Sequence, residues 1–268
     1  MKTINMAILF IMLFTTSIYA QTTSENIFSD YYKMVKNNKN SNNFIAIDYA
    51  IKILKTQPCS MEAFYTLSLL PKVLNNEGVK TKTQELKETY YSDIQNVNSN
   101  TAEKIILLTL LVSDSNSPEE IQENFNFFKN TLIKIKEECI NKDFAAIATF
   151  MLFLDVDNKE EYYNFFKTNY NEHPCIPLVD LIIISNYFGQ KEYDKCINDA
   201  KQFIEKYKNI TSPFGWKMIM DYYNLIIFNY IALNDNENAI KYYNIIENEA
   251  PDYDNIKQLQ KILKIRKK

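Results

Sequence analysis

Residues 187–200, YFGQKEYDKCINDA, and residues 230–243, YIALNDNENAIKYY, place related side chains at matching positions. Each stretch opens on a tyrosine and has landmark residues nine and thirteen places later. Residues 153–166 give a third copy. The equivalent residues are Phe153, Tyr187 and Tyr230 at the first position, Tyr162, Cys196 and Ala239 at the second, and Phe166, Ala200 and Tyr243 at the third. A repeat of about 34 residues predicts stacked helix pairs.

The second half of each copy carries a more specific signal. Residues 193–197, YDKCI, resemble the Tyr-Asp-Glu-Ala-Ile start of the second helix in the tetratricopeptide repeat family, and Pro174 and Pro251 close two of the units. The first-helix Trp and Leu-Gly pair of that family are missing, and Lys208 stands where a closing Pro is usual. The chain therefore resembles the tetratricopeptide repeat (TPR) family or a closely related α-hairpin repeat. The resemblance implies a right-handed α-α superhelix.

The rest of the chain also shows helical periodicity. We expect an all-α fold of about thirteen helices, arranged as six hairpins and a C-terminal capping helix over residues 256–265. Only three glycines occur, which argues against a turn-rich β fold. The domain prediction is a single helical-repeat domain over residues 21–268, with its clearest units at 143–176, 177–210 and 220–253. The alternative is a helical domain ending near Asn141, joined to a three-repeat module.

The first residues have the pattern of a secretory signal peptide. Lys2 precedes an apolar run from Met6 to Phe14, and a small residue, Ala20, precedes Gln21. Cleavage after Ala20 predicts an exported protein, periplasmic or secreted, with no stable membrane anchor; an uncleaved anchor is the alternative. Removing residues 1–20 takes away one lysine, which leaves 29 basic and 33 acidic residues and a net charge of −4. Such a mild charge argues against a nucleic-acid partner.

The four cysteines would meet an oxidising compartment after export. One disulfide and four separate thiols are both compatible with the sequence, and three pairings of all four exist. Cys196 occupies a position where the repeat family usually has Ala, so we expect it to be buried. Cys59 and Cys175 each follow a proline at a helix junction, where we expect exposure.

No catalytic, cofactor or metal motif stands out, and we expect the protein not to be an enzyme. His173 is the only histidine, and its place beside Pro174 predicts a solvated loop residue. Without further histidines a His-based zinc cluster or catalytic triad lacks parts. Asp155 and Asp157 are out of register for a calcium loop, and paired carboxylates such as Glu119-Glu120 fit helix starts.

The resemblance implies a binding face made by the first helix of each hairpin. Carried over by position, the candidate partner-binding residues are Met151, Asp155, Ser185, Phe188, Asp221, Asn224 and Phe228. The alternative is that Phe188 and Phe228 pack against a neighbouring helix. Trp216 is a further candidate within an insertion at 209–217, either as an exposed aromatic loop or folded onto the helices.

These patterns favour a non-catalytic, exported scaffold that binds a protein or peptide partner. Two rival hypotheses are an α/α-scaffold enzyme acting on an envelope polymer and a structural envelope component.

Overall fold

The computed structural model describes residues 27–36, 43–70, 77–113, 115, 117–155 and 159–264. Within these residues it contains thirteen α-helices, one short 3₁₀ helix and no strand, which confirms the all-α prediction for the described part. The expected signal peptide and the last four residues lie outside the described residues. The chain divides into two compact units, which meet in sequence at Pro174 and Cys175.

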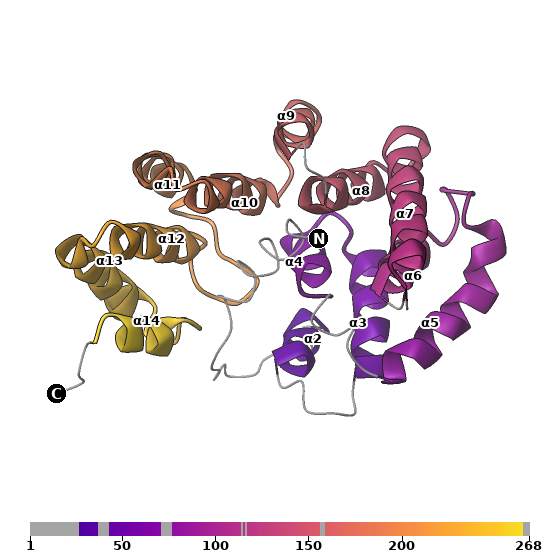
Figure 1. Cartoon of the computed structure of the whole chain (residues 1–268), viewed down its shortest axis with the longest axis horizontal. Coiled ribbons are helices and arrows are strands. Elements are labelled where there is room, and N and C mark those ends of the chain that lie inside the picture. Colours follow the sequence, from indigo (N-terminus) through magenta and orange to yellow (C-terminus); the bar gives the residue numbers. More distant parts are fainter. Residues whose placement is uncertain are drawn as a thin grey trace. The chain divides into compact units, whose positions relative to one another are not determined.

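The N-terminal unit is a layered array of eight helices (Figure 1). In chain order they are α2 (Ile27–Lys36), α3 (Asn43–Thr56), α4 (Met61–Leu69), α5 (Glu77–Tyr90), α6 (Thr101–Ser113), α7 (Pro118–Glu138), α8 (Lys142–Asp155) and α9 (Lys159–Asn169). The sequence predicts α6 to be central because it is apolar nearly all round. Ten of its thirteen residues are buried, and it packs against α3, α5, α7 and α8.

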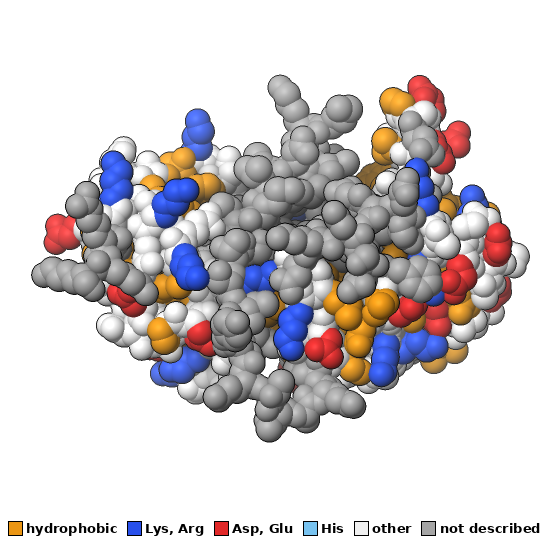
Figure 2. All heavy atoms as spheres, turned by 90° about the horizontal axis from the view of Figure 1, so that it is seen from below, with side chains coloured by type: hydrophobic (Ala, Val, Ile, Leu, Met, Phe, Trp, Pro, Cys, Tyr) orange, Lys and Arg blue, Asp and Glu red, His pale blue; other side chains and the backbone are white. Residues whose placement is uncertain are grey.

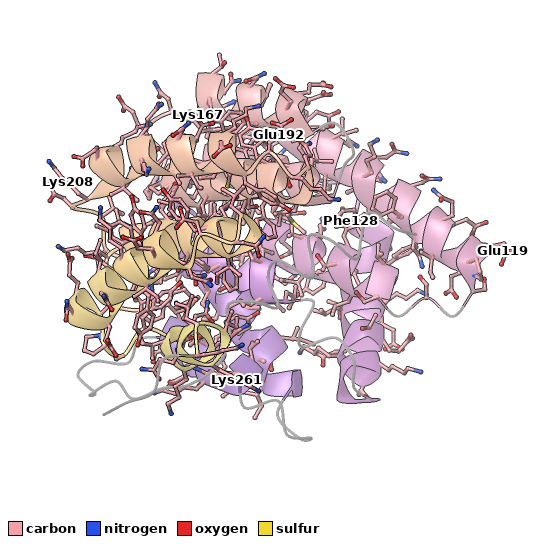
Figure 3. All side chains as sticks on the ribbon, turned by 60° about the vertical axis from the view of Figure 1, so that its left-hand side comes forward. Glu119, Phe128, Lys167, Glu192, Lys208 and Lys261 are labelled. Carbon is pink, nitrogen blue, oxygen red and sulfur yellow. The ribbon has the colours of Figure 1, made fainter. Side chains whose placement is uncertain are left out.

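Helix starts in this unit follow their capping residues. The sequence Ser117-Pro118-Glu119-Glu120 predicts a helix start, and the structure confirms it: Ser117 caps α7 by accepting a hydrogen bond from the Glu120 N–H at 3.2 Å, and Pro118 takes the first helical position. Ser60 caps α4 in the same way through the Ala63 N–H. Glu119, in the first turn of α7, points away from the helices (Figure 3). There its carboxylate complements the positive end of the helix dipole.

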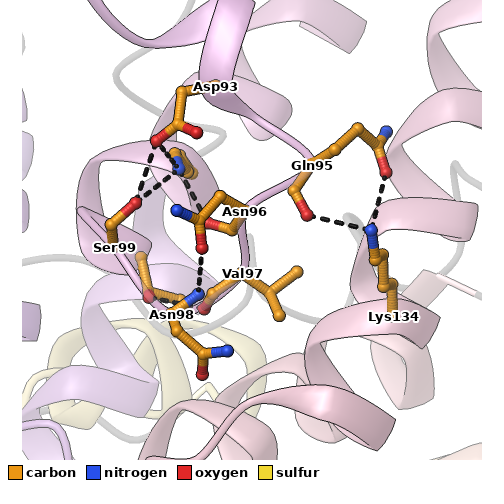
Figure 4. A network of polar contacts seen from close by, with 9 residues as sticks. Asp93, Gln95, Asn96, Val97, Asn98, Ser99 and Lys134 are labelled. Carbon is orange, nitrogen blue, oxygen red and sulfur yellow. Dashed lines mark hydrogen bonds and ion pairs between the residues drawn. The ribbon is translucent and has the colours of Figure 1, made fainter.

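The segment between α5 and α6 is fixed by one buried lysine. The Lys104 side chain is 1% exposed, and its ammonium donates to Asp93 Oδ2 at 2.9 Å, the Asn96 carbonyl at 2.7 Å and Ser99 Oγ at 3.2 Å. Figure 4 shows Asp93, Asn96 and Ser99 close together in this segment. A buried ammonium is tolerated when its three donors are satisfied, as they are here. This network tethers the loop to α6.

Two sequence predictions in this unit need correction. The stripe of Leu86, Tyr90, Ile94 and Val97 predicts a polar helix over 83–97, but the helix runs from Glu77 to Tyr90 because a 3₁₀ turn at Tyr91–Asp93 ends it. The sequence also predicts an N-cap at Asn100 with Glu103 as its partner. Asn100 does precede α6, but with a left-handed backbone (φ 50°). The Glu103 carboxylate accepts a bond from Lys55 of α3 at 2.7 Å. At Glu103, an ion pair between α3 and α6 therefore takes the place of the capping contact within α6.

The C-terminal unit contains two helix pairs and a closing helix (Figure 1). Its helices are α10 (Ile176–Gly189), α11 (Tyr193–Tyr207), α12 (Ile219–Ala232), α13 (Asn236–Glu249) and α14 (Ile256–Ile262). Each helix packs against the next, and α12 also contacts α10. Buried Asp180 of α10 accepts a hydrogen bond from the Tyr207 hydroxyl, and Lys206 lies 3.7 Å from the same carboxylate. This contact joins the start of α10 to the end of α11.

The start of α12 differs from the sequence prediction. The Ser212-Pro213 pair predicts a helix start, with Ser as the cap and Pro at the first helical position. The structure instead begins α12 at Ile219. The Ser212 N–H instead donates to the Trp216 carbonyl at 2.8 Å, and the turn between them uses Gly215 at φ 97°. An isolated β-bridge joins Thr211 to Lys217. The insertion therefore folds as a small hairpin-like loop, because a glycine with positive φ favours a tight turn over a helix start.

Within the described residues, no helix combines the length and apolar composition that crossing a bilayer requires.

Candidate functional site

The two helix pairs of the C-terminal unit repeat one another over a spacing of 43 residues. Helices α10 and α12 both span 14 residues, and α12 begins at Ile219, 43 residues after Ile176. Helices α11 and α13 begin at Tyr193 and Asn236, again 43 residues apart. The register predicted from Tyr187 and Tyr230 therefore agrees with the helix bounds.

The turns inside these pairs share their hydrogen bonds as well as their lengths. After α10, the Glu192 N–H donates to the Tyr187 carbonyl at 2.8 Å; after α12, the Asp235 N–H donates to the Tyr230 carbonyl, also at 2.8 Å. The second of the three connecting residues has a left-handed backbone in both turns, at Lys191 (φ 64°) and Asn234 (φ 59°). One backbone geometry is thus built from two different sequences.

Helices α8 and α9 of the N-terminal unit follow the same register. Helix α8 also has 14 residues, and it begins at Lys142, 34 residues before α10. Helix α9 begins at Lys159, 34 residues before α11. Their connecting residues 156–158 lie outside the described residues, so the turn itself is not compared.

The small-residue position of the repeat lies where two helices pack closely. Cys196 and Ala239 are both 0% exposed. The Cys196 thiol donates to the Ile184 carbonyl at 3.2 Å and accepts from Asn229 Nδ2 at 3.2 Å. Burial raises the pKa of Cys196 to about 12, which keeps it a neutral thiol. Its expected burial is confirmed, and its role is packing.

Four of the eight candidate partner-binding residues are buried side chains. Relative exposures are 4% for Met151, 7% for Ser185, 4% for Asp221 and 1% for Asn224. Asp221 accepts a hydrogen bond from the Tyr253 hydroxyl at 2.8 Å, which gives its carboxylate a structural contact. Asp155 is the last residue of α8, and the structure describes its backbone but not its side chain.

The three aromatic candidates are only partly buried. Phe188 lies against Tyr193, with ring centroids 5.5 Å apart. The Trp216 ring stacks on Phe214 at 5.0 Å and meets the Tyr253 ring edge-on at 5.1 Å. The insertion thus folds back onto its own unit. Phe228 lies on α12 and is also half-buried.

A half-exposed tyrosine cluster on α12 and α13 was not predicted from the sequence. Tyr230 and Tyr242 stack at 5.8 Å, and Tyr223 lies 5.7 Å from Tyr242. The Lys201 ammonium of α11 donates to the Tyr230 hydroxyl at 3.3 Å. We call these four residues the tyrosine cluster. The repeat register marks Tyr230 but gives no reason to group it with its neighbours.

A lysine also lies beside the equivalent tyrosine of the preceding hairpin. The Lys195 ammonium sits over the Tyr187 ring, 3.8 Å from its centroid. Both tyrosines are half-buried, so each ring has an exposed part beside a cation.

In the N-terminal unit, three junction residues form a second cluster. Cys59 lies in the turn before α4, Asp143 in the first turn of α8 and His173 in the turn after α9. Their ligand atoms all lie within 4.8 Å of one another. Thiol, carboxylate and imidazole together can hold a metal ion or exchange protons. We call this the Cys-Asp-His cluster.

His173 contradicts the prediction of a solvated loop residue. Its ring lies 4.9 Å from that of Phe64 and 5.9 Å from that of Phe166, with partial burial. Burial lowers the pKa of His173, and the nearby Asp143 carboxylate opposes that shift. The imidazole is therefore biased toward its neutral form.

All four cysteines lie among the described residues, and no disulfide joins any of them. Cys59 is exposed, as predicted. The same expectation is wrong for Cys175, which is 0% exposed at the start of α10. Cys175 and Met218 are equivalent across the 43-residue spacing, and Met218 is also 0% exposed, so the position belongs to the core.

Charged side chains of both signs are present on the described surface. On the face shown in Figure 2, acidic and basic side chains of the described residues are interspersed without a field of one sign. This agrees with the small net charge of the chain.

Comparisons with protein-family models, with curated proteins and with solved structures find no match to this chain. Functional inference therefore rests on the repeated hairpins, the tyrosine cluster and the Cys-Asp-His cluster.

Proposed function

We propose that this protein is an exported helical-repeat scaffold, related in architecture to TPR proteins, that binds a polypeptide partner without catalysis. The observation that carries the proposal is the turn shared by α10–α11 and α12–α13, which has one left-handed residue at the same position and the same hydrogen bonds in both copies, 43 residues apart. Helical hairpins repeated in one register stack on their neighbours and offer an extended surface that typically binds other chains.

The tyrosine cluster is the binding surface that we propose for the described residues. Tyrosines combine a large rigid apolar ring with a hydroxyl that donates and accepts hydrogen bonds, and they are enriched where proteins bind one another. Tyr223, Tyr230 and Tyr242 are each half-buried, so the helices hold the rings while part of each stays accessible. Lys201 adds a cation that can meet a carbonyl or carboxylate of the partner.

The buried candidate residues are unsuitable for substitutions that test this surface. Replacing Asp221 or Asn224 would remove interior polar side chains and perturb the fold, so loss of binding would be ambiguous. Tyr230 is better suited because its side chain is already partly exposed. Phe188 and Phe228 remain as outer positions for a second round of substitutions.

The test is photo-crosslinking in the native exported fraction, with a benzophenone amino acid in place of Tyr230. The matched control carries the same group at Tyr49, a half-buried tyrosine of α3. We expect a discrete polypeptide adduct from position 230 and none from position 49. Adducts absent from both positions, or equal at both, would contradict the proposal.

A further inference from the structure

The Cys-Asp-His cluster brings together the ends of three helix connections that are far apart in sequence. Cys59 follows α3, Asp143 follows the α7–α8 turn and His173 follows α9. All three belong to the N-terminal unit, so their proximity depends on the packing of one compact body. Cys59 is exposed, so an ion has access to the cluster from solvent.

Neighbouring residues fix the His173 ring and the backbone of Asp143. Phe64 and Phe166 confine the His173 ring, and Phe64 itself is fixed edge-on by Phe150 at 4.8 Å. Asn141 caps α8 by accepting a bond from the Asp143 N–H at 2.9 Å, which orients the residue that carries the carboxylate. Metal sites need such supporting contacts around their ligands. Only Cys59 is exposed.

We propose that Cys59, Asp143 and His173 form a mononuclear binding site for a divalent transition-metal ion, with Zn²⁺ as the best match. The donor set is one sulfur, one oxygen and one nitrogen, the three ligand types that Zn²⁺ accepts. A thiolate and a carboxylate would balance the charge of the ion. Three protein ligands leave a fourth position for water or a partner's side chain, on the solvent side of Cys59.

The distances fit the metal with a small adjustment. Bond lengths of about 2.0–2.3 Å place tetrahedral ligand atoms roughly 3.2–3.7 Å apart. The largest separation here is within 4.8 Å, so closure needs a movement of about 1 Å. Rotation of the exposed Cys59 side chain between staggered positions can supply it.

The arrangement suits metal binding better than nucleophilic catalysis. In a cysteine triad the carboxylate lies on the far side of the imidazole and orients it toward the thiol. Here the ligand atoms of Cys59, Asp143 and His173 all lie within 4.8 Å of one another, so the carboxylate reaches the thiol as well as the imidazole. Three donor atoms that converge in this way suit one shared ion better than a chain of proton transfers that ends at the thiol.

Cobalt and zinc titrations of the full chain test the site. Co²⁺ bound to a thiolate gives an intense charge-transfer band, and we expect that band at one ion per chain, with Zn²⁺ displacing it. Zn²⁺ should also protect Cys59 from alkylation by iodoacetamide. Absence of the band, or unchanged alkylation of Cys59 in saturating Zn²⁺, would overturn the proposal.

Variants then assign the ligands. Cys59→Ser should abolish the cobalt band, and Asp143→Asn and His173→Gln should each weaken Zn²⁺ binding at least tenfold. Asp194→Asn is the matched control, because Asp194 is the second residue of α11 as Asp143 is of α8. Circular dichroism checks that each variant is folded. Zn²⁺ affinity retained in both Cys59→Ser and His173→Gln would refute the site, and neither result bears on crosslinking at Tyr230.

Discussion

Lys191 and Asn234, 43 residues apart in the chain, occupy the same left-handed position in two helix–helix turns, with φ angles of 64° and 59°. In each turn the next residue donates its N–H back to a tyrosine carbonyl at 2.8 Å. A left-handed backbone costs most L residues about 1–2 kcal/mol, and Asn tolerates it better than Lys. The chain bears this cost twice to reverse direction within three residues.

Replacing Lys191 with glycine should therefore stabilise the protein. We expect a gain of about 0.5–1 kcal/mol in the free energy of unfolding for Lys191→Gly, and a smaller gain for Asn234→Gly. Urea unfolding followed by circular dichroism measures both. Gln190→Gly is the control, because Gln190 has φ −84° and glycine there should destabilise. A loss of stability in Lys191→Gly would contradict the shared-turn interpretation.

The small-residue position should respond alike in both hairpins. Cys196 and Ala239 are fully buried between helices, so leucine at either site overpacks the interior. We expect Cys196→Leu and Ala239→Leu each to destabilise by about 1–3 kcal/mol. Thermal or urea unfolding is the measurement, with exposed Asn198→Leu as a control that should change stability by less than about 0.5 kcal/mol. Tolerance of leucine at only one site would show that the two positions are not equivalent.

Much of the helical architecture is predictable because its signals are local. Apolar periodicity and the Ser117-Pro118 start specify α7, and the repeat register specifies α10 to α13 within a few residues. The main boundary error, at Ser212-Pro213, has a physical reason. The same Ser-Pro pair that starts α7 lies here in a turn closed by a bridge between Thr211 and Lys217, and only tertiary context separates the two cases.

The Cys-Asp-His cluster was not predictable because its members share no sequence spacing. Cys59 and His173 lie 114 positions apart, and each is adjacent to a proline at a helix junction. The neighbouring proline was the one usable signal in the sequence. It predicted that each residue is exposed to solvent, and it did not predict that the two lie close together. Cys175 shows the limit of the signal, because it also follows a proline and is nevertheless buried.

Substitution of Lys104 tests the hydrogen-bond network that fixes the α5–α6 loop. Lys104→Met keeps the apolar stem but removes three hydrogen bonds, and we expect a loss of about 1–3 kcal/mol in the free energy of unfolding. Urea unfolding at neutral pH measures it. Exposed Lys52→Met is the control and should change the free energy of unfolding by less than about 0.5 kcal/mol. A change below about 0.5 kcal/mol in Lys104→Met would show that the network contributes little.

Asp93 should make this network sensitive to acid. Hydrogen bonds from Lys104 and Ser99 lower the pKa of Asp93 below its usual value. The unfolded state therefore takes up a proton first as pH falls, so the contribution of Asp93 is present above pH 4 and is lost below it. We expect unfolding curves of the wild type and Asp93→Asn to differ at pH 6 and to converge toward pH 2–3. A constant difference over that range would exclude Asp93 titration as the cause.

Thiol reactivity should separate the cysteines by burial. In native protein with chelator present, iodoacetamide should modify Cys59 first, since Cys139, Cys175 and Cys196 are 4%, 0% and 0% exposed. The high pKa of Cys196, about 12, protects it further because only the thiolate reacts. Peptide mass spectrometry over time gives the order, and a urea-unfolded sample shows that all four can react. If Cys175 were labelled as fast as Cys59, Cys175 would be exposed, as its position after a proline predicts, and its burial in the structure would be contradicted.

Ionisation of the buried Tyr243 hydroxyl should destabilise the folded protein at alkaline pH. Its hydroxyl donates to Glu247 Oε1 at 2.7 Å and accepts from Gln260 Nε2 at 2.8 Å, and burial with the Glu247 contact raises its pKa to about 12. The unfolded phenol ionises near pH 10, so stability is fully present below pH 10 and is lost as pH rises toward 12. We expect Tyr243→Phe to lose less stability than the wild type over that interval, although it loses two hydrogen bonds at neutral pH. Urea unfolding at pH 7 to 11 measures the divergence, with exposed Tyr91→Phe as the control for removing one hydroxyl; parallel curves for wild type and Tyr243→Phe would show that the buried phenol does not set the alkaline limit.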